Sequence, residues 1–285
     1  MNALKTAMLL GLLSVLLMVG GQAVAGRQGM IIGLVLAVGM NFFSYFFSEK
    51  MALSMYRAQQ ITPEDNPAVY ARVFPIVQNL TSKMNLPMPR LWVIPEAQPN
   101  AFATGRNPEH SSVAMTEGLL AQMNDRELEG VLAHELGHVK HRDILISSVA
   151  ATLAAALTQI AYMAMWFGGG RSDDEENRSP YAGILMIILA PIAAGLIQMA
   201  ISRTREFSAD GAAARYTGSP DGLISALGKL ERGVQKYPME ANQATAHMFI
   251  TNPFSGGGLT RLFSTHPSTE QRIANLEALR MQGVH

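Results

Sequence analysis

The stretch His134-Glu135-Leu136-Gly137-His138 decides how the rest of this sequence is interpreted. In a helix, His134 and His138 are separated by about 40° around the axis, so both imidazoles project from one face, one turn apart. Two such imidazoles can bind a single metal ion. Glu135 projects beside them, where it can act as a general base toward a water molecule at the metal.

The flanking sequence predicts that this stretch lies in a helix of a small mixed domain. Asn124 can cap the helix N-terminus, with Glu127 in the position of a capping box. Upstream, residues 90–94 and 111–115 have the composition of short strands, and residues 100–105 between them form a possible exposed edge strand. Residues 267–281 predict an amphipathic closing helix. A mainly α fold with a small β-sheet follows.

Long apolar stretches surround this domain. Each has close to the ~20 residues that a helix needs to cross the ~30 Å hydrocarbon core of a membrane, and none has an internal charge. They span residues 6–25, 29–47, 144–167 and 181–201. Only 15% of the 285 residues are charged, against roughly 25% in globular proteins. We therefore predict four transmembrane helices, as hairpins in residues 1–48 and 144–201, around a domain formed by residues 49–143 and 202–285.

The charges beside these stretches predict their orientation. Basic residues follow the second span, precede the third and follow the fourth: Lys50, Arg57, Lys140, Arg142, Arg203 and Arg205. The loop 171–178 instead holds two basic and four acidic residues. The positive-inside rule places the domain in the cytoplasm and the acidic loop outside.

The first stretch has a second interpretation. Lys5 precedes it, and Ala23-Val24-Ala25 fits the small-x-small pattern of a signal-peptide cleavage site. The second span follows after only Gly26-Arg27-Gln28, which favours a retained helical hairpin. Cleavage would leave the orientation of the remaining spans unchanged.

A third metal ligand is needed, because a catalytic zinc site has three protein ligands and an open fourth position. The chain has no cysteine, so this ligand is His, Asp or Glu. The third span begins shortly after His138, and the fourth ends shortly before Glu206. A hairpin of these spans returns both residues to one membrane surface, so Glu206 is the best candidate.

Other assignments around this ligand remain open. Asp210 lies one turn after Glu206 and can accept a hydrogen bond from a ligating imidazole, which fixes the imidazole tautomer. Glu206 can alternatively pair with Arg203 or Arg205 at the membrane surface. His141 lies on nearly the same helix face as His138, so spacing alone does not exclude it as a ligand.

Essentially the whole length of the chain resembles a known protein family. It resembles the HtpX-type membrane metalloproteases and, more distantly, the CAAX prenyl endopeptidases. The motifs that match are His134-Glu135-Leu136-Gly137-His138, Arg205-Glu206-Phe207-Ser208-Ala209-Asp210 and Ser264-Thr265-His266-Pro267. The order of two spans, a soluble segment, two further spans and closing helices also agrees.

The resemblance implies a gluzincin-like site. One zinc ion per chain would be bound by His134, His138 and Glu206, with Glu135 as general base and Asp210 supporting the ligands. It also implies that His266 helps to stabilise the oxyanion, although His266 alone would be interpreted as a turn residue before Pro267.

The resemblance further implies how substrates bind and which they are. Asn100 and Ala101 match an edge-strand motif, where a substrate peptide pairs as an added strand. From the residues alone, Asn100 is a turn residue after Pro99. The family is associated with quality control in the bacterial plasma membrane, so misfolded or damaged membrane proteins are the expected substrates.

Two other functions remain as alternatives. A CAAX-type prenyl-peptide endopeptidase shares the motifs but normally has more spans. A metal-binding membrane scaffold without catalysis would be expected to lack the base or a ligand, yet Glu135, Glu206 and Asp210 are all present. A nucleic-acid partner is not indicated, because 22 basic residues balance 22 acidic residues.

Overall fold

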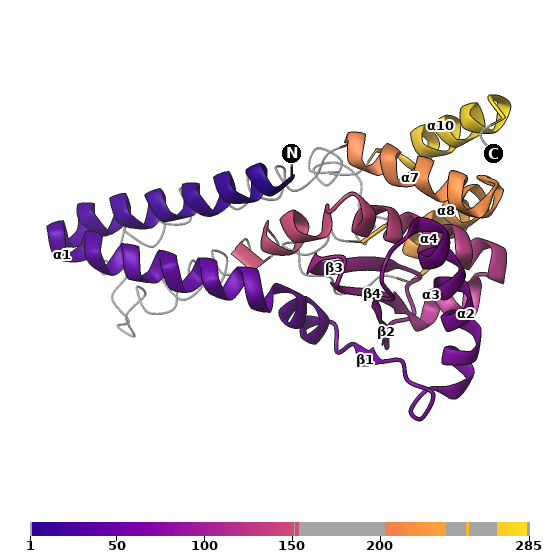
Figure 1. The fold of residues 1–285 in the computed structure, drawn as a ribbon, viewed down its shortest axis with the longest axis horizontal. Helices are drawn as coiled ribbons and strands as arrows, with labels where there is room; N and C mark the ends of the chain where they lie inside the picture. The colour runs from indigo at the N-terminus through magenta and orange to yellow at the C-terminus, as the bar shows by residue number, and fades with distance from the viewer. Residues whose placement is uncertain (1, 151, 154–202, 238–248, 251–266, 284–285) are drawn as a thin grey trace, which may run out of the picture.

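The computed structural model describes residues 2–150, 152–153, 203–237, 249–250 and 267–283. Figure 1 shows a long helical hairpin, α1 (Asn2–Met55), that extends from a body containing the sheet and the other helices. The helices of the body are α2 (Pro67–Met84), α3 (Glu117–Gln122), α4 (Asp125–Lys140), α7 (Arg203–Thr217), α8 (Asp221–Lys236) and α10 (Thr269–Met281).

Segment α1 is helical throughout but reverses direction at Gly26, whose φ of 57° is a left-handed conformation that glycine adopts without steric cost. Asn41, on the second arm, forms hydrogen bonds with the first arm. Its Nδ2 donates to the Leu10 carbonyl at 3.3 Å and to the Ser14 hydroxyl at 3.0 Å. This hydrogen bonding between apolar arms is typical of membrane helix pairs.

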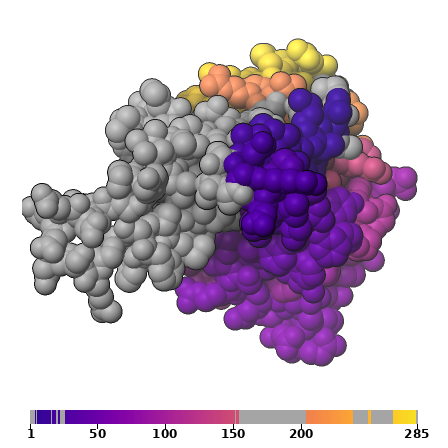
Figure 2. Space-filling model, turned by 90° about the vertical axis from the view of Figure 1, so that its left-hand side faces the viewer, coloured from indigo at the N-terminus to yellow at the C-terminus, as the bar shows by residue number. Residues whose placement is uncertain are grey.

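The surface of α1 is strongly apolar. Among the described residues, every exposed large apolar side chain except Met88 and Met281 lies on α1. Figure 2 views the molecule from the tip of this hairpin, with its arms in front of the body. Such an extended apolar surface is too large for an ordinary water-exposed face and indicates contact with a membrane or a partner.

The first two predicted spans, residues 6–25 and 29–47, both lie in α1. Within the described residues, the stretch Gly26–Met55 has the length and hydropathy to cross a membrane, and it contains the predicted span 29–47. In the first arm, Thr6–Val19 is a shorter apolar stretch within the predicted span 6–25. The helix continues past the predicted end of the second span to Met55.

A helix begins at Ile144, where the third span is predicted to begin, and it is described only in part. Residues 144–150 and 152–153 are helical. Val149 and Leu153 pack there against Leu9 and Leu13 of α1, and all four are buried. The rest of this span, the acidic loop and the fourth span lie outside the described residues, so four membrane crossings remain a prediction.

The sheet has four strands in the order β1-β2-β4-β3: β1 (Gln59–Gln60), β2 (Arg90–Ile94), β4 (His110–Thr116) and β3 (Ala101–Asn107). β2 and β4 are parallel, whereas β3 and β4 form an antiparallel hairpin. The predicted strands 90–94 and 111–115 are thereby confirmed. β3 lies at one end of the described sheet, as predicted for the edge strand, but its residues 101–105 are buried rather than exposed, because α1 and α4 pack against the strand.

Helix α4 lies at the centre of the body. It packs against β3 and β4, against α2, and against α7 and α8 on its other sides. Its side chains Leu128, Val131, Leu132 and Leu136 are fully buried in the largest apolar cluster. The helix with the two histidines is therefore held rigidly from several directions.

Candidate metal centre

The start of α4 is fixed by a capping box, as the sequence predicts. The Asn124 side chain accepts a hydrogen bond from the Glu127 amide at 3.0 Å, and the Glu127 carboxylate accepts one from the Asn124 amide at 2.9 Å. Two amides that lack intrahelical partners are thereby satisfied. The register of the helix, and so the direction of its histidines, follows from this start.

The end of α4 is a Schellman motif. Arg142 adopts a left-handed conformation with φ 58°, its amide donates to the Val139 carbonyl, and the Asp143 amide donates to the His138 carbonyl at 2.9 Å. The chain turns back at this point. The turn places the Asp143 carboxylate beside the His138 ring.

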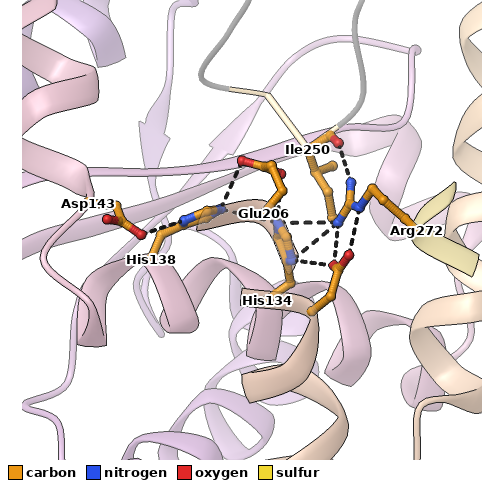
Figure 3. A network of polar contacts seen from close by, with 7 residues as sticks. His134, His138, Asp143, Glu206, Ile250 and Arg272 are labelled. Atoms are coloured by element: carbon orange, nitrogen blue, oxygen red, sulfur yellow. Dashed lines mark hydrogen bonds and ion pairs between the residues drawn. The ribbon is translucent and has the colours of Figure 1, made fainter. Parts of the chain in front are cut away.

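Glu206 reaches the two histidines from α7. The Nε2 atoms of His134 and His138 lie 3.2 Å apart. One carboxylate oxygen of Glu206 lies 3.7 Å from His134 Nε2, and the other lies 3.6 Å from His138 Nε2. Figure 3 shows the three side chains converging. The potential ligand atoms of His134, His138 and Glu206 all lie within 4.8 Å of one another, close enough to hold one metal ion. Within the described residues, these three form the group that meets this condition.

Small residues allow α7 to approach α4 so closely. A Cβ atom added at Gly137 would lie 3.1 Å from the Ala209 Cα and 3.3 Å from the Ala212 Cβ. The two helices therefore meet at glycine and alanine, and Glu206 projects toward the two histidines of α4. The prediction that His138 and Glu206 meet in space agrees with this packing.

Each imidazole is oriented by a carboxylate at its other nitrogen. His134 Nδ1 lies 2.9 Å from Asp210, and His138 Nδ1 lies 3.2 Å from Asp143. Carboxylates in this position accept the Nδ1 proton and leave Nε2 available as the metal-binding atom. The donor set of two imidazole nitrogens and one carboxylate oxygen fits a divalent metal ion.

Arg272 and Asp143 belong to this site, although sequence patterns did not single them out. Arg272 projects from α10, is almost fully buried, and forms two hydrogen bonds with the Asp210 carboxylate, at 2.6 and 2.9 Å. It also donates to the Ile250 carbonyl at 2.9 Å (Figure 3). The unbroken amphipathic pattern of the closing helix gives no signal that one arginine faces inward.

Burial and neighbouring charges set the protonation of the site. Burial, assisted by the Arg272 charge, lowers the pKa of His134 to about 4, so this ring is neutral as a metal ligand must be. Burial also lowers the pKa of His138, but Asp143, Glu206 and Glu135 outweigh it and raise that pKa to about 9, so a metal ion that binds His138 has to displace a proton. Although burial opposes it, Arg272 keeps the pKa of Asp210 below its ordinary value.

Glu135 interacts with the metal ligands His138 and Glu206 and with strand β3. It is almost fully buried, and burial raises its pKa to about 7, with the Glu206 charge acting in the same direction. A backbone hydrogen bond from Ala103, on strand β3, acts against this shift. A carboxylate with a pKa near neutrality is suited to accept and release a proton.

The predicted substrate residues Asn100 and Ala101 are buried at the start of β3. The Asn100 amide and carbonyl bond to Thr116 of β4, and the Asn100 side chain accepts the Ala101 amide at 3.1 Å. The Ala101 carbonyl accepts a hydrogen bond from the Ile250 amide at 3.0 Å. That bond fixes the start of β3, and the second lone pair of the carbonyl can still accept a hydrogen bond from an added strand.

His141 lies within the described structure, whereas His266 does not. His141 is the exposed C-cap residue of α4 and is not part of the metal-binding group. The described geometry therefore favours Glu206 over His141 as third ligand. His266 lies outside the described residues, and its role in oxyanion stabilisation stays a prediction.

Comparisons with known proteins agree with this site. The model of peptidase family M48 matches residues 67–280. A protease HtpX homolog of Methylibium petroleiphilum is 52% identical over 99% of both chains. Homologs of the same name from Desulfatibacillum aliphaticivorans and Burkholderia thailandensis are 53% and 52% identical over 99% of this chain, and over 91% and 98% of their own lengths.

A solved structure shares the fold. The crystal structure of S. mikatae Ste24p superposes with a TM-score of 0.53 at 18% sequence identity. The match covers 97% of this chain, which spans 65% of Ste24p, and it supports the architecture alone. Together, the family match and the full-length relatives show that the chain belongs to peptidase family M48, among the membrane-associated HtpX-type metalloproteases.

Proposed function

We propose that this chain is a membrane-embedded, zinc-dependent endopeptidase that hydrolyses misfolded or damaged membrane proteins at the cytoplasmic face of a bacterial inner membrane. The observation that carries the proposal is the convergence of His134, His138 and Glu206 beside the buried Glu135. Two imidazoles and one carboxylate are the ligands of many catalytic zinc sites. When bound, zinc supplies a Lewis acid that polarises the peptide carbonyl and acidifies water.

Glu135 is the general base of the proposed reaction. Its carboxylate takes a proton from the attacking water molecule and passes that proton to the nitrogen of the leaving amine. The Ala103 backbone contact supports this role, because it holds the carboxylate at the edge of the sheet, where a peptide can bind. His266 is proposed to stabilise the oxyanion.

Substrate is proposed to bind as an extended strand along β3, near Asn100 and Ala101. In the β3–β4 hairpin, Asn100 bonds toward β4, so alternation directs the backbone groups of Ala101 and Ala103 away from β4. An added strand on that side lies next to Glu135. Backbone pairing gives affinity with little sequence preference, which suits a protease that acts on unfolded segments.

The proposed location rests on the apolar hairpin and on the loop charges. Lys50 and Arg57 follow the second predicted span, and Lys140 and Arg142 precede the third, which favours a cytoplasmic protease domain. The bacterial origin of the relatives favours the inner membrane. The site would then lie close to the membrane surface.

The test is proteolysis by the purified full-length protein and its Glu135→Gln variant. The variant should bind as much zinc as the wild type and cleave casein or an unfolded membrane protein at least about 100-fold more slowly, because the base is lost. Cleavage by Glu135→Gln at the wild-type rate would refute the proposal. A farnesylated peptide, offered in parallel, distinguishes a prenyl-peptide endopeptidase from a general endopeptidase.

A further inference from the structure

We propose that Arg272 is a positioning residue that connects the metal ligand His134 to the substrate-binding edge of β3, through Asp210 on one side and the backbone of Ile250 on the other. Its role in substrate binding rests on the function proposed above. Its role toward the metal rests only on the ligand geometry.

The metal side of this connection is a fork. Arg272 Nε donates to Asp210 Oδ2 at 2.9 Å, and Nη2 donates to Asp210 Oδ1 at 2.6 Å. The planar guanidinium thereby fixes the plane of the carboxylate as well as its position. His134 Nδ1 lies 2.9 Å from the same Oδ1 atom and 3.2 Å from Arg272 Nη2 itself, so the orientation of the imidazole depends on the position that Arg272 imposes.

The substrate side uses the remaining guanidinium nitrogen. Arg272 Nη1 donates to the Ile250 carbonyl at 2.9 Å, and the Ile250 amide donates to the Ala101 carbonyl at 3.0 Å. Ala101 begins β3, and Ala103, two residues later on the same outward side, contacts Glu135. Ile250 therefore holds the start of the edge strand beside the general base.

Phe249 anchors this short segment independently. Its ring is fully buried and packs edge-on against Phe102 at 5.3 Å and Tyr56 at 4.9 Å between ring centroids. The anchor keeps residues 249 and 250 on the sheet, while Arg272 sets the direction of the Ile250 carbonyl. A side chain that only filled space between α7 and α10 would not need three separate polar contacts.

This arrangement predicts two separable effects. Loss of the fork to Asp210 should weaken zinc binding, and loss of the Ile250 contact should weaken binding of an extended peptide. Arg272→Met should therefore show both defects. Asp210→Asn should show the zinc defect alone when peptide binding is measured at saturating zinc, and Ile250→Pro, which removes the amide donor, should show the peptide defect alone.

The experiment uses full-length protein in detergent. Zinc affinity is measured by competition with a chromophoric chelator, and KM by cleavage of a fluorescein-labelled casein peptide at saturating zinc. Affinity for the same peptide is also measured in the Glu135→Gln background, where cleavage is suppressed. Arg272→Met should lower zinc affinity by about 10- to 100-fold, the usual effect of losing an outer-shell contact, and raise KM several-fold.

Two further variants separate positioning from general stability. Arg280 lies on the same helix but forms an exposed ion pair with Asp221, so Arg280→Met should preserve zinc affinity and KM. Arg272→Lys keeps the charge without the fork and should give intermediate zinc affinity. Equal losses in Arg280→Met and Arg272→Met would overturn the proposal, as would wild-type zinc affinity and KM in Arg272→Met.

The two proposals can fail separately. If wild-type protein does not cleave or bind the casein peptide, the proposed function is refuted. The zinc measurements then still decide the metal side: unchanged zinc affinity in Arg272→Met overturns the role of Arg272, whereas a loss confined to Arg272 and Asp210 variants supports it.

Discussion

His138 Nδ1 lies 3.2 Å from the Asp143 carboxylate, although Asp143 follows the end of the helix that holds His138. The contact exists because Arg142 adopts a left-handed conformation and turns the chain back toward the ring. Asp210 makes the equivalent contact with His134 from a different helix. Both metal-binding imidazoles are therefore oriented by carboxylates, one local and one distant in the sequence.

Asp143→Asn should lower zinc affinity by about 10-fold or more, because an amide orients the His138 ring less strongly than a carboxylate does. Chelator competition on purified protein measures this effect. Asp125→Asn is the control, since Asp125 lies at the exposed start of the same helix and pairs with Arg72. Equal zinc affinity in Asp143→Asn and wild type would contradict the orienting role.

Two glycines of α8 should respond in opposite ways to alanine. A Cβ atom at Gly222 would lie 2.4 Å from the Arg126 carbonyl oxygen, whereas one at Gly228 would meet only the end of the Arg232 side chain, at 3.9 Å. Gly222→Ala should destabilise the domain by about 1–3 kcal/mol through overpacking against α4. Gly228→Ala should leave stability unchanged or raise it by up to about 1 kcal/mol.

Thermal unfolding in detergent compares the two variants directly. Because both substitutions are in one helix, its intrinsic propensity cannot explain a difference in sign. A lower unfolding temperature for Gly228→Ala than for Gly222→Ala would show that the close contact between α4 and α8 is wrong.

Glu127 should make stability depend on pH. Burial acts to raise its pKa, but hydrogen bonds from Lys229, Ser225 and the Asn124 amide outweigh burial and hold that pKa below the ordinary value of 4.5. The charged form is therefore favoured in the folded state. Its stabilisation is fully present above about pH 4.5 and is lost as pH falls through the lower pKa of the folded protein.

The comparison is between wild type and Glu127→Gln. At pH 7 the variant should be less stable by about 1 kcal/mol, because the contact to the partly exposed Lys229 is screened by solvent. The difference should shrink as pH falls below about 4.5. Unfolding temperatures that differ by the same amount at pH 7 and at pH 4 would contradict this account.

The sequence predicts those parts of the site that depend on local patterns. The capping box of Asn124 and Glu127, the shared face of His134 and His138, and the strand periodicity of residues 90–94 are properties of short segments, and the structure confirms them. Glu206 was predictable for a different reason. A helical hairpin returns the chain to its starting surface, so the apolar stretches imply a long-range contact.

Other contacts follow from packing that no local pattern specifies. Arg272 occupies one position of an ordinary amphipathic helix, and only the docking of α10 on α7 places its guanidinium beside Asp210. Asp143 reaches His138 through a left-handed residue that is arginine rather than glycine, so the usual turn signal is absent. Ile250 contacts β3 through its backbone, which every residue type shares.

The most direct test of the account is the zinc content and casein cleavage of Glu206→Ala beside wild type and His141→Ala. We predict that wild type and His141→Ala bind stoichiometric zinc, and that Glu206→Ala loses both stoichiometric zinc and proteolysis. Retention of stoichiometric zinc in Glu206→Ala, with its loss in His141→Ala, would contradict the metal centre formed by His134, His138 and Glu206.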